Sequence, residues 1–190
     1  MSQSVNVSGD VLDQKFRQLF RTADADGDGI IDGNDVLATV TRMMERFSVE
    51  EGSPREAAVR MAFSRYWEKV EQAVGGDTSN GITPDQYVAG LRSLFAGSQD
   101  AFESLAAPLG DALLALADVD GNGGLSKKEF HTFESSMNMS DAEIEAAFKA
   151  LDRDGDGVIS REEVIAALRD FYTSEDPNAA GNAFFGGMLS

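Results

Sequence analysis

The 190-residue chain contains no cysteine, one histidine, one tryptophan and four prolines. The lack of cysteine excludes disulfides, thiolate metal sites and cysteine nucleophiles. No apolar run approaches the ~20 residues of a membrane-spanning helix. The N-terminus shows neither the basic segment nor the apolar core of a signal peptide, and Ser2 stands where N-myristoylation requires glycine. We therefore expect a soluble, cytoplasmic protein that is not associated with a membrane.

Basic residues are also scarce, since 16 Lys and Arg face 33 Asp and Glu, for a formal net charge of −17. Such a chain repels nucleic acid and anionic lipid and attracts cations, so we expect no nucleic-acid partner. The acidic residues are not spread evenly. Thirteen of the 33 lie in three twelve-residue segments, 24–35, 118–129 and 152–163. A generally acidic, soluble surface would account for the net charge but does not explain this clustering.

These three segments repeat one pattern of side chains. Each has oxygen-bearing side chains at positions 1, 3 and 5, glycine at 6, an aliphatic residue at 8 and a carboxylate at 12. This is the pattern of the EF-hand calcium loop. Calcium takes six to eight oxygen ligands at about 2.3–2.6 Å, and a glycine at position 6 permits the sharp turn of the loop. The pattern predicts three calcium sites.

The expected ligands follow from the loop positions. Positions 1, 3, 5 and 12 supply side-chain oxygens, position 7 supplies a backbone carbonyl, and position 9 acts through water. In the first loop these are Asp24, Asp26, Asp28, Ile30, Asp32 and Asp35. In the loop at 118–129 they are Asp118, Asp120, Asn122, Gly124, Ser126 and Glu129. In the loop at 152–163 they are Asp152, Asp154, Asp156, Val158, Ser160 and Glu163.

Position 12 distinguishes the first loop from the other two. Glu129 and Glu163 are long enough to bind an ion through both oxygens, whereas Asp35 is one methylene shorter. A single oxygen from Asp35 lowers the coordination number toward the six that magnesium prefers. The first loop also carries five carboxylates, the most of the three. We therefore expect the Asp24–Asp35 site to accept Mg²⁺ as well as Ca²⁺.

EF-hand loops work in pairs, so the first loop requires a partner. Aligning Ile82 with position 8 gives a loop over 75–86 whose position 1 is Gly75, without a side chain. Position 6 is Asn80 and position 12 is the uncharged Gln86, which leaves Asp77 as the one acid at a ligand position. A hard dication requires several anionic oxygens. We predict that this loop holds no calcium and serves as the structural partner of the first.

Helical periodicity flanks every loop, which predicts four helix–loop–helix units, here called hands one to four in chain order. Capping boxes at Ser53–Glu56, Thr83–Gln86 and Ser140–Glu143 mark helix starts. Pro108 interrupts an apolar helical pattern, so that helix either kinks there or ends and restarts. The expected fold is an all-α compact globule with two pairs of EF-hands and a short two-stranded β pairing between loops. We place the pairs at 1–97 and 98–174, followed by a tail at 175–190.

The whole chain resembles the sarcoplasmic calcium-binding proteins and their bacterial relative calerythrin. The resemblance rests on the silent second loop, on Asp35 at position 12, and on loop starts 51 residues apart in the first pair (24 to 75) against 34 in the second (118 to 152). The tail segment 182–189 is similar to the ending of this family and of the coelenterazine-binding proteins. The resemblance implies a compact globule with a tail packed on its core, which accounts for Phe184, Phe185, Met188 and Leu189.

Three functions are compatible with these features. The first is an intracellular Ca²⁺/Mg²⁺ buffer, which stays closed when it binds metal. The second is a calcium sensor, whose hands open and expose an apolar groove to a target protein. The third is a carrier of an apolar small molecule, which requires an interior cavity. No nucleophile–base pair is evident and His131 is the one histidine, so we predict no enzyme. A monomer is the simplest assembly.

Overall fold

The computed structural model describes residues 10–95, 99–135 and 139–185. The N-terminal half contains helices α1 (Asp10–Ala23), α2 (Gly33–Arg46), α3 (Pro54–Val74) and α4 (Pro84–Phe95). The middle contains α5 (Gln99–Ala101), the π-helix η2 (Phe102–Ala106), α6 (Ala107–Ala117), strand β1 (Gly124–Ser126) and α7 (Lys127–Ser135). The C-terminal part contains α8 (Asp141–Leu151), strand β2 (Val158–Ser160), α9 (Arg161–Thr173) and the 3₁₀ helix η3 (Ala180–Ala183).

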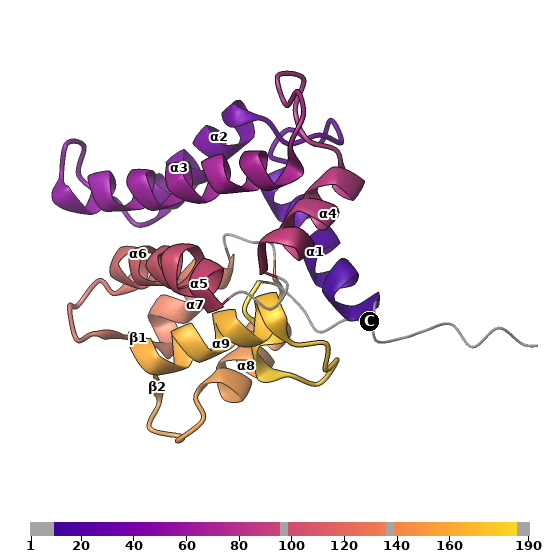
Figure 1. Cartoon of the computed structure of the whole chain (residues 1–190). Helices are drawn as coiled ribbons and strands as arrows, with labels where there is room; N and C mark the ends of the chain where they lie inside the picture. The colour runs from indigo at the N-terminus through magenta and orange to yellow at the C-terminus, as the bar shows by residue number, and fades with distance from the viewer. Residues whose placement is uncertain (1–9, 96–98, 136–138, 186–190) are drawn as a thin grey trace, which may run out of the picture.

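The helices form two groups that face each other (Figure 1). Helices α1 to α4 make up the upper group in this view, and α6 to α9 with the two strands make up the lower one. The long helix α3 packs against both α4 and α6 and therefore bridges the groups. Within the described ranges, no helix is long and apolar enough to cross a membrane.

The loops pair as the sequence predicts. Ile31 and Ile82 form an isolated antiparallel bridge, with N–O distances of 2.9 and 2.8 Å in the two directions. Strands β1 and β2 pair antiparallel, with Leu125 opposite Ile159. All four residues occupy position 8 of their loops, so the bridge confirms the alignment of the degenerate loop 75–86. Hand one therefore pairs with hand two, and hand three pairs with hand four.

Side-chain caps begin several helices where the sequence indicates. Ser53 accepts a hydrogen bond from the amide of Glu56, with Pro54 as the first helical residue of α3. Reciprocal capping boxes begin α8 at Ser140 and α9 at Ser160. These caps satisfy amide groups that have no partner inside the helix, so position 9 of hand four also begins its exiting helix.

The chain around Pro108 neither breaks nor restarts. A five-residue π-helix over Phe102–Ala106 leads directly into α6, and Pro108 lies in the first turn of α6. The wider π turn accommodates the missing amide hydrogen bond of proline without ending the helix. Of the two alternatives, this outcome is closer to the kinked helix than to two separate helices.

A continuous apolar core joins both groups of helices and the tail. Phe184 and Phe185 are 1% and 5% exposed, and their rings contact Phe133 of α7 and Phe171 of α9 respectively. The expected packing of the tail is therefore confirmed for these two residues. The other two apolar tail residues, Met188 and Leu189, lie outside the described ranges.

The buried side chain of Lys15 fastens the tail to α1 and α9. Its ammonium group donates to the carbonyl oxygens of Asp170 and Ser174 and to Oδ1 of Asn182, at 3.0, 2.6 and 3.1 Å. Burial lowers the pKa of Lys15 to about 8, so the group remains largely charged at neutral pH. Its three N–H donors match three acceptors, two of them carbonyls at the C-terminal end of α9 and the third the Asn182 side chain of η3. A positive charge at the C-terminal end of a helix also interacts favourably with the helix dipole.

Candidate metal centres

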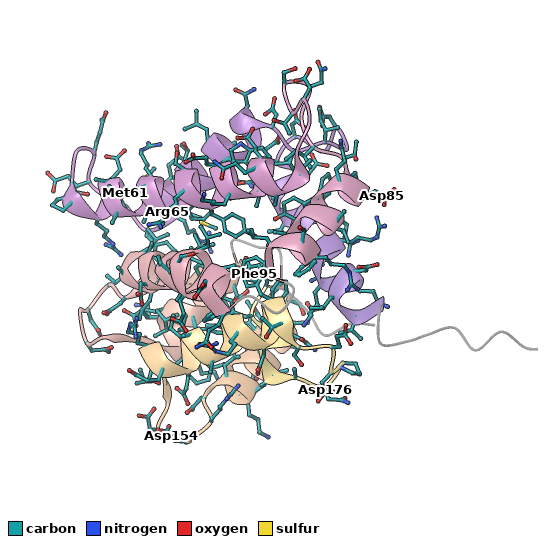
Figure 2. The ribbon with its side chains drawn as sticks, viewed as in Figure 1. Met61, Arg65, Asp85, Phe95, Asp154 and Asp176 are labelled. Carbon is teal, nitrogen blue, oxygen red and sulfur yellow. The ribbon has the colours of Figure 1, made fainter. Side chains whose placement is uncertain are left out.

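The three loops adopt nearly the same backbone conformation. The glycines at position 6 have φ angles of +89°, +88° and +88°, for Gly29, Gly123 and Gly157. A side chain at position 6 would be strained, because this is the left-handed region that favours glycine. The loops follow α1, α6 and α8 and lie at the periphery of the molecule, as Asp154 illustrates at the lower edge of Figure 2. Solvent therefore has access to all three.

Carboxylates converge within each loop. Three groups each bring ligand oxygens from positions 1, 3 and 12 within 4.8 Å of one another. The groups are Asp24, Asp26 and Asp35; Asp118, Asp120 and Glu129; and Asp152, Asp154 and Glu163. Negative charges at this separation repel strongly unless a cation lies between them. Three anionic side chains per loop fit a hard divalent cation, which seeks oxygen ligands.

The position-12 carboxylates fold back over their loops in the same way. Each accepts the amide of loop position 2 on one oxygen and the amide of position 9 on the other. For Asp35 the distances are 2.9 and 2.8 Å, for Glu129 they are 2.7 and 2.9 Å, and for Glu163 they are 2.7 and 2.9 Å. Asp35 thus reaches the same backbone donors with a shorter side chain, and it is only 5% exposed.

Hydrogen bonding favours the ionised form of these carboxylates. For Glu129 and Glu163, burial opposes ionisation, but bonds from Ser126 or Ser160 and from loop amides outweigh it and lower the pKa. The amide of Asn34 is the chief cause of the lowered pKa of Asp32. A depressed pKa keeps the loops charged at neutral pH, which is the state that binds a cation.

Among the described residues, the acids at positions 5 and 9 are not members of these clusters. The position-5 side chain accepts the amide of position 7 in every loop, at 2.9, 2.9 and 2.8 Å for Asp28, Asn122 and Asp156. The position-9 side chains of Asp32 and Ser160 cap the helix that follows. The carbonyls of Ile30, Gly124 and Val158 and the water-mediated contacts of position 9, including Ser126, stay predictions.

The loop of hand two is built differently. Asp77 accepts the amide of Ser79, at 3.0 Å, and Gln86 caps its own helix through the amide of Thr83 at 2.9 Å. In the described part of the chain, no cluster of acids forms here. Gly81 packs closely against Ile30, and a Cβ at this position would lie 2.8 Å from Ile30 Cδ1. Loop two therefore supports the backbone of loop one, while its lack of calcium remains a prediction.

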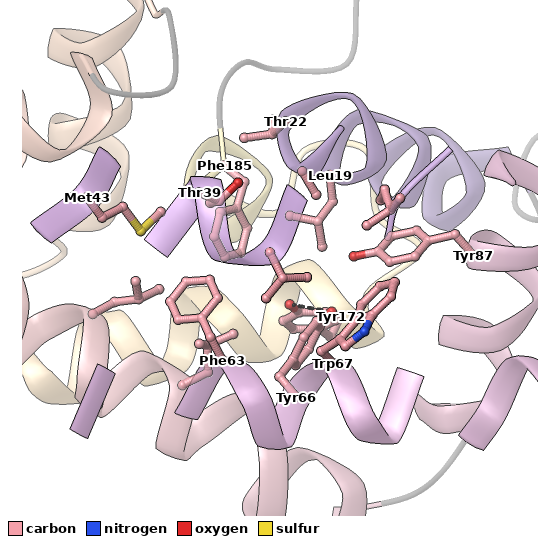
Figure 3. A pocket seen from close by; sticks show the side chains of 15 residues that line it. Leu19, Thr22, Thr39, Met43, Phe63, Tyr66, Trp67, Tyr87, Tyr172 and Phe185 are labelled. Atoms are coloured by element: carbon pink, nitrogen blue, oxygen red, sulfur yellow. Dashed lines mark hydrogen bonds between the residues drawn. The ribbon is translucent and has the colours of Figure 1, made fainter. Parts of the chain in front are cut away.

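An apolar cavity lies between the two groups of helices (Figure 3). Its volume is about 80 Å³. Phe63, Tyr66 and Trp67 line it from α3, and Tyr172 and Phe185 line it from α9 and the tail. The Tyr172 hydroxyl donates to the Tyr66 hydroxyl at 3.1 Å, and burial raises the pKa of both phenols. A drug-sized ligand occupies about 300–1,000 Å³, so the cavity in this conformation holds only a much smaller guest.

His131 contributes nothing to these centres. Its ring is half exposed and lies 3.0 Å from Asp141 and 3.2 Å from the Ser135 hydroxyl. Sequence reasoning overlooked two buried ionisable residues, Lys15 and Glu134, which are 1% and 0% exposed. Lys15 lies among apolar residues of α1 and gave no signal. Glu134 could have been found by aligning the four exiting helices.

Comparisons with known proteins agree with this geometry. A family model described as an EF-hand domain pair matches residues 109–169, and an EF-hand model matches residues 16–35. Calerythrin from Saccharopolyspora erythraea is 23% identical over 163 residues, covering 85% of this chain and 92% of calerythrin. A calcium-binding protein from Streptomyces coelicolor, described in connection with prokaryotic calcium-mediated regulation, superposes with a TM-score of 0.73 at 25% identity, over 87% of this chain and 99% of that one.

A further match is the coelenterazine-binding protein from Renilla muelleri in its calcium-loaded apo form. It superposes with a TM-score of 0.70 at 20% identity, over 96% of this chain and 99% of that chain. At this level of identity the likeness concerns the fold alone. It shows that a similar fold occurs in a protein named for a small-molecule ligand.

Proposed function

We propose that this chain, a calerythrin-like EF-hand calcium-binding protein, acts in the cytoplasm as a monomeric Ca²⁺/Mg²⁺ buffer with three metal sites. In this proposal residues 1–97 form a pair with one active hand, residues 98–174 form a pair with two active hands, and residues 175–190 form the tail. Each active site uses the ligands expected at positions 1, 3, 5, 7, 9 and 12. The protein binds ions and catalyses no reaction.

The observation that carries the buffer role is the occupied apolar surface of the C-terminal pair. The tail places Phe184 against Phe133 of α7 and Phe185 against Phe171 of α9, with all four rings buried. A sensor presents that surface to its target, whereas here the chain covers it with its own residues. Across the described residues the exposed large apolar side chains are Leu37, Met61 and Val119, which lie on different elements.

We expect calcium to change the exposed apolar surface very little. A buffer keeps the tail in place, so the fluorescence of an apolar-surface dye stays nearly constant when calcium is added to the apo protein in the presence of magnesium. A Phe184→Ala variant serves as the positive control, because loss of this ring uncovers Phe133 and raises dye binding. A several-fold rise in fluorescence for the unmodified protein upon calcium addition supports the sensor alternative instead.

Magnesium competition is expected at the first site. Calorimetric titration of the apo protein should show three calcium sites, one of which weakens when magnesium is present. Replacing Asp35 by Glu adds the missing methylene and a second oxygen ligand, so the preference of this site for calcium over magnesium should rise on the order of tenfold. Glu163→Asp is the matched reverse change and should introduce magnesium competition at the fourth hand. Three calcium sites that magnesium does not weaken would contradict the role given to Asp35. Four calcium sites would contradict the prediction that the second loop binds no calcium.

The carrier alternative depends on the cavity of about 80 Å³ between the helix groups. Its lining is almost entirely apolar, and the hydroxyl groups of Tyr66 and Tyr172 already pair with each other. A drug-sized guest in this cavity therefore requires the groups to move apart first. The test is to extract protein purified from its source and to look for a bound organic molecule. Calcium binding without such a molecule favours the buffer. A chromophore or lipid extracted in stoichiometric amount favours the carrier.

A further inference from the structure

The four exiting helices carry equivalent residues five positions after the twelfth residue of each loop. These residues are Val40, Leu91, Glu134 and Leu168 in hands one to four. All four are buried, with exposed fractions of 3%, 0%, 0% and 0%. Three hands therefore place an aliphatic side chain at this point of the core, and hand three places a carboxyl group there. Hand three therefore differs from the other three hands of the same chain at this position.

Neither carboxylate oxygen of Glu134 has a hydrogen-bond partner. Phe130 and Phe133, on the same buried face of α7, are 0% and 1% exposed. An ionised carboxylate in such surroundings is far more costly than a neutral carboxyl group, so the side chain takes up a proton rather than remain charged. Burial is the one cause that raises the pKa of Glu134 well above its usual value.

No charged group on the neighbouring elements compensates Glu134. Helix α6 carries Asp111, which pairs with Arg161, and neither strand nor the tail segment 180–185 carries a charge. The charged residues of α8 are all exposed, and they are Asp141, Glu143, Glu145 and Lys149. On α7 itself, the remaining titratable residues are Lys127, Lys128, Glu129 and His131. Lys127 pairs with Glu145, His131 bonds Asp141, and Glu129 faces its loop.

We propose that Glu134 is a proton-binding site of the C-terminal pair, and that calcium binding there is coupled to proton uptake by this carboxyl group. The proposal rests on the proposed function, and it adds that α7 is held less tightly without metal, so that water reaches Glu134 while the tail stays in place. Glu129, an expected calcium ligand, and Glu134 lie on one helix, so metal that fixes α7 against the core also removes Glu134 from water. Without metal Glu134 is hydrated and ionised at neutral pH, and with metal bound it is protonated.

The direction of this coupling is opposite to that of the ligand carboxylates, which bind metal as anions. Linkage is reciprocal, so if calcium promotes proton binding, protons promote calcium binding. A group whose folded-state pKa is raised contributes stability at low pH that is lost as pH rises through that pKa. Calcium affinity in the C-terminal pair should therefore fall as pH rises from the ordinary glutamate pKa of about 4.3 to the raised pKa of Glu134, by at most about tenfold per pH unit for one proton.

The test is a calorimetric calcium titration of the full-length apo protein at pH 7.5, repeated in buffers with different ionisation enthalpies. The dependence of the heat on buffer counts the protons exchanged. Wild type should take up as much as one proton more than Glu134→Gln and Glu134→Leu, where leucine is the residue of hands two and four. Glu51→Gln, which removes an exposed carboxyl group, should behave as wild type. Equal proton counts in wild type and Glu134→Gln overturn the proposal.

A second measurement does not depend on the variants folding. The carbon chemical shift of the Glu134 carboxyl group in calcium-loaded wild type should report a protonated acid at pH 7.5, and an ionised group overturns the proposal. The number of calcium sites from the same titrations tests the buffer function separately. If three calcium sites are found without excess proton uptake, the role of Glu134 is rejected and the buffer function stands. If no calcium binds, the proposed function itself is rejected.

Discussion

Removing calcium should lower the melting temperature of the protein by on the order of 15–30 °C. Each ion that binds only the folded state adds about 2.7 kcal/mol when free calcium is one hundred times the dissociation constant, and three sites add about 8 kcal/mol. For a chain of this size, 1 kcal/mol corresponds to roughly 2–4 °C. Without metal the same sites oppose folding, because each holds three carboxylate oxygens within 4.8 Å of one another.

The measurement is thermal unfolding followed by near-ultraviolet circular dichroism, in millimolar calcium and in excess chelator. Tyr66 and Trp67 line the cavity between the helix groups and report on packing there. Magnesium added to the chelated protein should restore part of the loss through the Asp24–Asp35 site. Unchanged melting and unchanged aromatic dichroism after chelation would falsify the metal-dependent fold.

Replacing Gly181 by alanine should release the tail and lower the melting temperature by on the order of 10 °C. A Cβ at this position would lie 2.1 Å from the carbonyl oxygen of Ala167 and 2.6 Å from Cβ of Asp170, both on α9. Neither atom moves without displacing the helix, so the tail must lift instead. Losing the burial of a single phenylalanine typically costs about 3–5 kcal/mol, and Phe184 and Phe185 both depend on this docking.

The matched control is Gly33→Ala, since a Cβ there meets no atom within 4 Å and the backbone is helical. This variant should melt at or slightly above the wild-type temperature, because alanine favours a helix over glycine. Gly181→Ala should also bind more apolar-surface dye, because Phe133 and Phe171 lose their tail contacts. If Gly181→Ala and Gly33→Ala have the same melting temperature, the contact of Gly181 with α9 does not hold the tail.

Much of the fold follows from local patterns in the sequence. The helix starts at Ser53, Ser140 and Ser160 and the position-8 pairing of Ile31 with Ile82 all follow from short motifs. Pro108 is an instructive exception, since proline rules predict a kink or an end but do not predict that a π-helix over 102–106 absorbs the disruption. Which solution forms depends on how Phe102 and Leu105 pack in the core, where both are buried.

The candidate metal centres were accessible to sequence reasoning for a physical reason. A calcium loop is a local structure of twelve residues, so the spacing of its oxygens in the chain determines their spacing around an ion. The structure brings positions 1, 3 and 12 of each predicted loop together. It also shows that Asp35 reaches the same two amides as Glu129 and Glu163, which the difference in side-chain length did not suggest.

The number of hands, the three acidic loops and the degenerate second loop follow from the sequence alone, because each depends on residues close together in the chain. The pairing of the loops follows from the repeat of the hand. The long-range contacts of single side chains depend on the tertiary packing. Lys15 meets residues 155 or more positions away, Gly181 must fit against α9, and Glu134 is buried without a partner. Periodicity locates a buried helix face, but the groups that meet it depend on how distant segments pack.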